Sequence, residues 1–222
     1  MPVVIDRNEH LRAMGIDVWV RRDASNEEVS ASVTIADTAL SLEDLEKDVR
    51  VCVQCELHAT RINTVFGAGN ASADWMFIGE APGAEEDRQG LPFVGRAGQL
   101  LNAMLGAVDM TRDQVYIANV LKCRPPNNRD PQGVEVERCE PYLHLQVARI
   151  RPRIIVAMGR FAAQSLLKTS RPISKLRGER FHYGDTEIPL VVTYHPAYLL
   201  RNPIDKRKAW DDLLFARKVS AD

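Results

Sequence analysis

Four short apolar runs divide the chain into alternating segments. They cover residues 75–78, 115–121, 154–158 and 190–193, and each is followed by glycine, polar or charged residues. Runs of this length predict buried strands. Apolar residues at helical spacing in residues 98–105, 131–150, 160–168 and 206–219 predict helices between and after them. The alternation predicts an α/β three-layer sandwich, with a mostly parallel, central four-stranded sheet flanked by helices.

The first 40 residues lack any sustained apolar period. We therefore expect residues 1–40 to form a loosely ordered N-terminal extension and residues 41–222 to form a single domain. Ser41 and Asp44 resemble a capping box, which predicts that a helix begins here.

Polar side chains follow three of the predicted strands. These side chains are Glu80, Asn119 and His195. The carboxyl ends of parallel strands meet at one edge of a sheet, where α/β proteins bind ligands. The first of these loops is rich in acids and glycines and also carries Phe93, an apolar side chain that a solvated loop does not need. We therefore predict a ligand site here, the alternative being an ordinary surface loop.

Charge is unevenly distributed along the chain. Residues 1–50 hold 11 acidic and 6 basic residues, and the remainder holds 19 acidic and 23 basic residues. A mildly basic body is compatible with a nucleic-acid partner. No apolar run is long enough to cross a membrane, and the first ten residues lack the apolar core of a signal peptide. We therefore expect a cytoplasmic protein without a membrane partner.

The cysteines form a set of four: Cys52, Cys55, Cys123 and Cys139. Disulfides are rare in the cytoplasm, and no strand leads into the C-x-x-C pair as in a thioredoxin-like motif. Four thiolates suit either a tetrahedral zinc ion or a [4Fe–4S] cluster, and their spacing does not separate these. Four unlinked buried cysteines are the third alternative.

Several longer motifs occur together in the chain. They are GEAPG at 79–83, PFVGRAG at 92–98, NVLKCRPP at 119–126 and HPAYLLRNP at 195–203, in addition to the cysteines. In this order they resemble the family 4, iron–sulfur type of uracil-DNA glycosylase, over about residues 45–214. The resemblance implies the uracil-DNA glycosylase fold and a [4Fe–4S] cluster on the four cysteines. It also implies an enzyme that flips uracil out of DNA, hydrolyses its N-glycosidic bond and leaves an abasic site for base excision repair.

The resemblance also implies roles for particular residues. Glu80 is the expected catalytic carboxylate at the sugar, with Glu86 in reserve, although Glu86 is equally compatible with a structural set of acids. His195 is expected to stabilise the negative charge that develops on uracil, the alternative being a core histidine.

Base recognition is expected from a second group. Asn119 offers both a donor and an acceptor to uracil, and Phe93 would stack on the base, although it could be a core residue. Gly79 and Ala81 are expected to line the same pocket. Leu199 and Leu200 would fill the vacated base stack, or else pack inward, and Arg201 would contact phosphate.

The expected partners are uracil-containing DNA, single- or double-stranded, and downstream abasic-site repair enzymes. We expect a monomer associated with the nucleoid. Related alternatives are a non-catalytic uracil-DNA binding protein and a member that becomes covalently trapped on DNA. Position 81 is Ala, and residues 93–119 hold no histidine, which favours the turnover enzyme over the trapping branch. A redox iron–sulfur protein is a more distant alternative.

Overall fold

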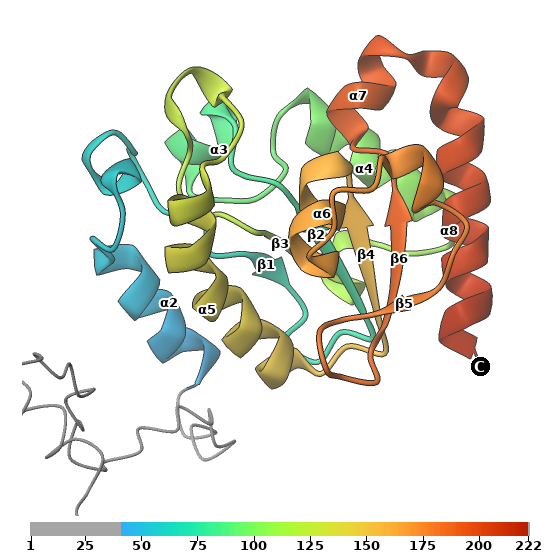
Figure 1. The fold of residues 1–222 in the computed structure, drawn as a ribbon, viewed down its shortest axis with the longest axis horizontal. Helices are drawn as coiled ribbons and strands as arrows, with labels where there is room; N and C mark the ends of the chain where they lie inside the picture. The colour runs from blue at the N-terminus through green and yellow to red at the C-terminus, as the bar shows by residue number, and fades with distance from the viewer. Residues whose placement is uncertain (1–40, 222) are drawn as a thin grey trace, which may run out of the picture. The chain divides into compact units, whose positions relative to one another are not determined.

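The computed structural model describes residues 41–221; the predicted extension, residues 1–40, lies outside the described residues. A six-stranded mixed sheet, ordered β1-β3-β2-β4-β6-β5, forms the centre (Figure 1). Four neighbouring strands are parallel: β3 (Tyr116–Asn119), β2 (Trp75–Gly79), β4 (Ile154–Met158) and β6 (Pro189–Thr193). They coincide with the predicted strands, which confirms the α/β class.

Two short strands extend this parallel centre at its edges. They are β1 (Ala68–Gly69), antiparallel to β3, and β5 (Phe181–His182), antiparallel to β6. Each has only two residues, too few for a periodic pattern. The predicted four-stranded sheet is therefore the core of a larger, mixed one.

Helices cover both faces of the sheet. On one face lie α5 (Gly133–Ile150) and α6 (Arg160–Leu167), and on the other α4 (Arg96–Ala107) and α8 (Lys206–Ala221) (Figure 1). Every residue of β2 and of β4 is buried, as expected of strands covered on both faces. Helix α2 (Leu42–Val51) packs on the outside of α5 through Leu45 and Val49.

The acidic loop after β2 differs from its prediction, because Ala84–Gln89 form a short helix, α3. Its three acids, Glu85, Glu86 and Asp87, lie in the first turn, where the helix dipole favours negative charge. Gly90, at φ 72°, ends the helix in the left-handed conformation that favours glycine.

Short helices connect the remaining segments. Helix α7 (Pro196–Arg201) follows β6 after two residues. The single-turn helices are η1 (Glu56–Ala59), η2 (Arg112–Gln114), η3 (Pro126–Asn128), η4 (Ile173–Lys175) and η5 (Pro203–Asp205). Within residues 41–221, every helix is too short or too polar to span a lipid bilayer.

Candidate active site

A cavity of about 400 Å³ opens where β2, β3 and β6 end. This volume lies in the range of small-molecule sites. Glu80, Asn119 and His195 all line it, so the three predicted strand ends do meet. The other lining residues are Ala81, Pro82, Gly83, Glu86, Phe93, Ala97, Pro125, Asn128, Arg129, Ala197, Tyr198 and Arg201.

Glu80 is a half-buried carboxylate directly after β2. Its backbone carbonyl accepts a hydrogen bond from the Leu121 N–H at 3.0 Å, which ties this position to the chain leaving β3. Burial raises the pKa of Glu80 above its ordinary value of 4.5. The nearby Asp130 raises this pKa further, and Arg160, which is ion-paired with Asp130 at 2.8 Å, lowers it.

Asn119 is almost completely buried, with 1% of its surface exposed. Within the described residues its Oδ1 has no hydrogen-bond partner. An unpaired buried acceptor costs about 1–3 kcal/mol, so its presence at a cavity indicates a ligand-binding group. A Cβ atom on Gly79 would lie 2.4 Å from Asn119 Oδ1 and 2.7 Å from Phe93 Cζ. Only glycine at this position leaves room for the amide and the ring side by side.

Phe93 adopts a left-handed backbone conformation, with φ 53°. For a bulky residue this conformation is strained and persists only where the surroundings hold it. The ring is buried at the cavity wall, its centroid 5.5 Å from that of His195. A Cβ atom on Gly98 would lie 1.7 Å from the Phe93 carbonyl oxygen, so α4 packs directly against this turn.

Glu86 holds the N–H side of the Phe93 turn. Its Oε1 accepts hydrogen bonds from the backbone N–H groups of Val94 at 2.9 Å and Gly95 at 3.0 Å. Glu86 lines the cavity as predicted, but this oxygen is engaged in positioning the loop.

Arg112 holds the carbonyl side of the same turn. Its guanidinium donates to the Pro92 oxygen at 2.6 Å, to the Phe93 oxygen at 3.1 Å and to Asn102 Oδ1 at 3.2 Å. Arg112 stands in none of the motifs, so the sequence alone did not indicate it. The strained turn is therefore fixed from both sides by side-chain hydrogen bonds.

His195 lies between β6 and α7 and caps that helix. Its Nδ1 accepts a hydrogen bond from the Ala197 N–H at 3.1 Å, which leaves Nε2 as the donor of a neutral ring. Burial lowers the pKa of His195 to about 4. The positive charge of Arg201 also lowers this pKa, whereas the negative charge of Glu86 raises it. A Cβ atom on Gly159 would lie 2.9 Å from His195 Cβ, so the backbone after β4 packs close to this residue.

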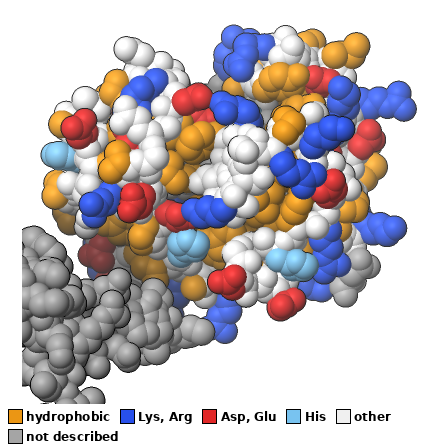
Figure 2. Space-filling model, viewed as in Figure 1, with side chains coloured by type: hydrophobic (Ala, Val, Ile, Leu, Met, Phe, Trp, Pro, Cys, Tyr) orange, Lys and Arg blue, Asp and Glu red, His pale blue; other side chains and the backbone are white. Residues whose placement is uncertain are grey.

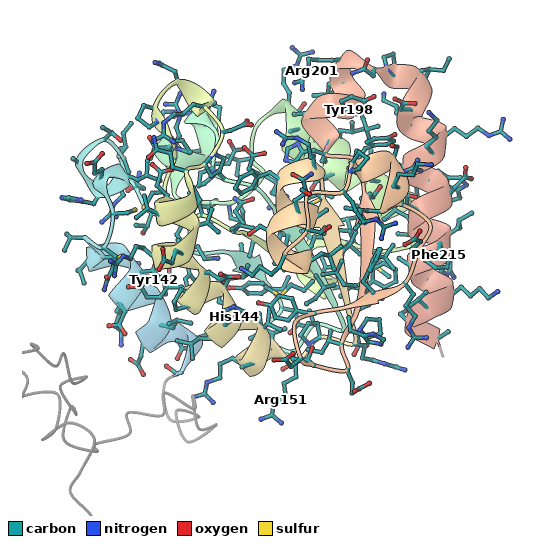
Figure 3. The ribbon with its side chains drawn as sticks, viewed as in Figure 1. Tyr142, His144, Arg151, Tyr198, Arg201 and Phe215 are labelled. Atoms are coloured by element: carbon teal, nitrogen blue, oxygen red, sulfur yellow. The ribbon has the colours of Figure 1, made fainter. Side chains whose placement is uncertain are left out.

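The four cysteines line a second cavity. Cys52 ends α2, Cys55 precedes η1, Cys123 follows β3 and Cys139 lies in α5. Tyr142 of α5 borders the same cavity, on the side toward α2 (Figure 3).

Two neighbours hold the buried cysteines of this cavity. Arg61 Nη1 donates to Cys123 Sγ at 3.2 Å, and the Lys122 N–H donates to Cys139 Sγ at 3.2 Å. The four cysteines therefore share one cavity, whose buried pair is held by these two donors.

The two leucines predicted to meet DNA are placed differently. Leu199 is 1% exposed and belongs to the core beside α4, whereas Leu200 is 37% exposed. Arg201 is exposed and lines the mouth of the active-site cavity, near Tyr198 (Figure 3). Lys and Arg side chains gather over α7 and the start of α8 (Figure 2). Exposed bases there include Arg201, Lys206, Arg207 and Lys208.

Comparison with known proteins relates this arrangement to a family. A sequence model described as "Uracil DNA glycosylase superfamily" matches residues 66–214. The chain is 46% identical to the type-4 uracil-DNA glycosylase of Archaeoglobus fulgidus, over 73% of this chain and 85% of that protein. It is 40% identical to the type-4 enzyme of Pyrobaculum aerophilum, over 78% of this chain and 92% of that protein. It is 31% identical to the type-5 enzyme of the same organism, over 59% of this chain and 64% of that protein. The chain belongs to the uracil-DNA glycosylase superfamily, in which it groups with the type-4 enzymes.

Proposed function

We propose that this protein is a monofunctional uracil-DNA glycosylase that flips uracil out of DNA, hydrolyses its N-glycosidic bond and leaves an abasic site. The observation that carries the proposal is the meeting of Glu80, Asn119 and His195 in one cavity, each from a different strand end. The type-4 relatives of Archaeoglobus fulgidus and Pyrobaculum aerophilum are named for this activity. The reaction begins base excision repair.

Recognition of uracil rests on Asn119. Uracil presents an N3–H donor beside the O4 acceptor, and cytosine presents the opposite pair. The unpartnered Oδ1 of Asn119 suits the uracil N3–H, and its amide N–H suits O4. A buried amide held in this orientation leaves unpaired groups against cytosine, which gives strong rejection. Phe93 stacks on the base face, while Gly79 and Ala81 complete the wall.

Bond cleavage rests on Glu80. A water molecule attacks C1′ of the deoxyribose while the bond from C1′ to uracil N1 breaks, through an oxocarbenium-like transition state. The Glu80 carboxylate orients the water, accepts its proton and offsets the positive charge on the sugar. Its raised pKa makes it a better base than an exposed glutamate.

Departure of the base rests on His195. Uracil leaves with negative charge shared by N1 and O2, and the Nε2–H of the neutral imidazole donates to O2. The backbone N–H of Ala197 holds this donor in place before the reaction. Removing one preorganised donor typically lowers a rate about a hundredfold to a thousandfold. We assign Glu86 a positioning role here, through the backbone of the Phe93 turn.

The four cysteines are proposed to hold a [4Fe–4S] cluster. The four cysteines line one cavity, which is compatible with a shared metal group. The resemblance of the motifs to the iron–sulfur type of uracil-DNA glycosylase supports a cluster over a single zinc ion. Bound there, the cluster would supply a structural link between α2, the end of β3 and α5.

DNA is proposed to bind across the cavity mouth and the basic surface over α7 and α8. Leu200, rather than the buried Leu199, would enter the vacated base stack. Arg201 and its basic neighbours would contact phosphates. We propose that the protein acts as a monomer on single- or double-stranded DNA in the cytoplasm at the nucleoid, and leaves its product to abasic-site repair enzymes.

The test uses anaerobically purified protein and a labelled oligonucleotide that carries one uracil, followed by hot alkali. We expect cleavage at the uracil, release of free uracil, and intact control strands that carry thymine or cytosine. Glu80→Gln should lower the single-turnover rate about a hundredfold or more. Glu187→Gln, which changes an exposed glutamate in the loop before β6, should leave the rate unchanged.

Other outcomes would replace the proposal. An intact strand bound by wild-type protein would indicate a non-catalytic binding protein. A protein–DNA adduct that survives denaturation would indicate covalent trapping. Release that requires a change in the redox state of the protein would favour a redox role.

A further inference from the structure

Lys122 is a fully buried lysine that the proposed chemistry does not use. The residue is 1% exposed, and within residues 41–221 its ammonium group has no ion pair with a carboxylate. The ammonium donates to the backbone oxygen of Asn119 at 2.8 Å and to Gln146 Oε1 at 2.5 Å. A buried cation is unfavourable unless its surroundings compensate for lost hydration, so its retention calls for an explanation.

The backbone of Lys122 lies against the cysteine cavity. Its N–H donates to Cys139 Sγ at 3.2 Å, and the next residue in the chain is Cys123. Its carbonyl oxygen accepts from the Val65 N–H at 2.7 Å. Lys122 therefore contacts Cys139 through its backbone N–H. Through its side chain, it contacts the end of β3, where Asn119 stands.

Gln146 fixes the other end of this arrangement. It is completely buried in α5, and its Nε2 donates to the Phe66 oxygen at 2.9 Å and to the Tyr116 hydroxyl at 3.2 Å. Because Nε2 is fully occupied, Oε1 has to face Lys122. The ammonium is thereby held at a defined point beneath Asn119.

The position of Asn119 decides which base the pocket accepts. Its Oδ1 lies directly beside the backbone of Gly79, where an added Cβ atom would stand only 2.4 Å from it. A small shift of the strand end would therefore misplace the amide against the edge of the base. From these contacts we propose that Lys122 is a positioning residue that couples the cysteine group to the uracil-recognising amide of Asn119. This inference rests on the proposed function.

Lys122→Met tests the coupling, because it keeps an unbranched side chain of similar length and removes the donor. Two buried oxygens, those of Asn119 and Gln146, then lose their partner. We expect the ratio of uracil to cytosine release from matched strands to fall at least tenfold. We also expect free uracil to inhibit the reaction about tenfold more weakly. Visible absorbance per protein should be retained, because all four cysteines remain.

Controls separate this effect from a general loss of structure. Lys47→Met removes a lysine of α2 that is exposed and pairs with Asp44 of the same helix, and should change neither ratio nor inhibition. Lys122→Arg, which retains donors for both oxygens, should restore part of the discrimination. If Lys122→Met does not fold, Gln146→Leu keeps the lysine and its bond to the Asn119 oxygen but removes the second acceptor of the ammonium. This variant should lower the same ratio to a smaller extent.

The outcomes are distinct. Wild-type discrimination and inhibition in Lys122→Met would overturn the inference, as would equal losses on all substrates with an unchanged ratio. Absence of uracil release by the wild-type protein in the same assay would overturn the proposed function and the inference together.

Discussion

At the scale of single residues, the pocket depends on side chains in unfavourable states that their neighbours maintain. Phe93 has a strained backbone, the side-chain oxygen of Asn119 lacks a partner in the part of the chain that the structure describes, and Glu80 has a raised pKa. Such groups cluster at functional sites, where the surrounding structure offsets the strain. Motifs indicated these three residues from the sequence. The Arg112 guanidinium that holds the Phe93 turn could not be predicted, because its partners are backbone oxygens about 20 positions away.

The protonation states of Glu80 and His195 predict how uracil release depends on pH. Glu80 acts when ionised, and burial raises its pKa, so release should fall as the pH drops through a value above 4.5. His195 acts when neutral, and burial lowers its pKa to about 4. Its protonation should therefore add no loss near the ordinary value of 6.5. A plot of the single-turnover rate against pH, between about pH 4.5 and 8.5, should show a single fall in rate on its acid side, the acid limb.

Two substitutions beside Glu80 should move that limb in opposite directions. Arg160→Gln removes the positive charge that lowers the pKa of Glu80, so the limb should shift to higher pH. Asp130→Asn removes the negative charge that raises it, so the limb should shift to lower pH. An acid-side fall in rate that stays at the same pH in both variants would contradict the role of the Glu80 carboxylate. A fall near pH 6.5 that disappears in His195→Gln would contradict the neutral state of His195.

At the scale of elements, the site is formed in the loops that connect the ends of parallel strands to short helices. Apolar runs were sufficient to predict β2, β3, β4 and β6, and hence the edge at which Glu80, Asn119 and His195 meet. Helix α3 was predicted as a loop, because five of its six residues are polar or charged and show no apolar period. The fold stabilises this helix through Asp87, whose buried Oδ1 accepts from the Ile62 and Asn63 N–H groups. Contacts of that kind have no local signal in the sequence.

Helix α7 allows its two adjacent leucines to be distinguished. Leu200→Ala changes a side chain that is 37% exposed, so we expect little loss of stability. If it fills the vacated stack, release from duplex DNA should fall more than release from single strands. Leu199→Ala should instead create a core cavity, lower stability by about 2–5 kcal/mol and affect both substrates alike. Rates on matched single and double strands, with thermal unfolding of each variant, make the comparison. The reverse pattern would assign the DNA contact to Leu199.

At the scale of the whole molecule, the four cysteines lie between the covered sheet and the peripheral segment that holds α2 and η1. The four central strands are buried by helices on both faces, so their sequences are nearly continuous apolar runs, and these runs allowed the strands to be predicted. The edge strands β1 and β5 depend on pairing with β3 and β6 rather than on their own two residues. Spacing of the cysteines predicted a shared metal group but did not separate zinc from a cluster, because how Cys55 and Cys123 approach one another depends on the fold.

Removal of the proposed cluster should therefore loosen one part of the molecule selectively. Cys52 and Cys55 lie at the end of α2 and before η1, whereas Cys123 and Cys139 belong to the sheet side and α5. Without a shared metal group, α2 is held chiefly by Leu45 and Val49 against α5 and Phe66. We expect amide protection from hydrogen exchange to fall about tenfold or more in residues 42–60, equivalent to ~1.4 kcal/mol. Protection of β2 and β4 should remain, because their hydrogen bonds and the side chains that cover them involve none of these cysteines.

Exchange measured by mass spectrometry, on protein before and after iron chelation under oxidising conditions, provides the comparison. An equal loss of protection in the central strands would show that the cysteine group supports the whole fold, and no loss in residues 42–60 would show that it does not join the two parts.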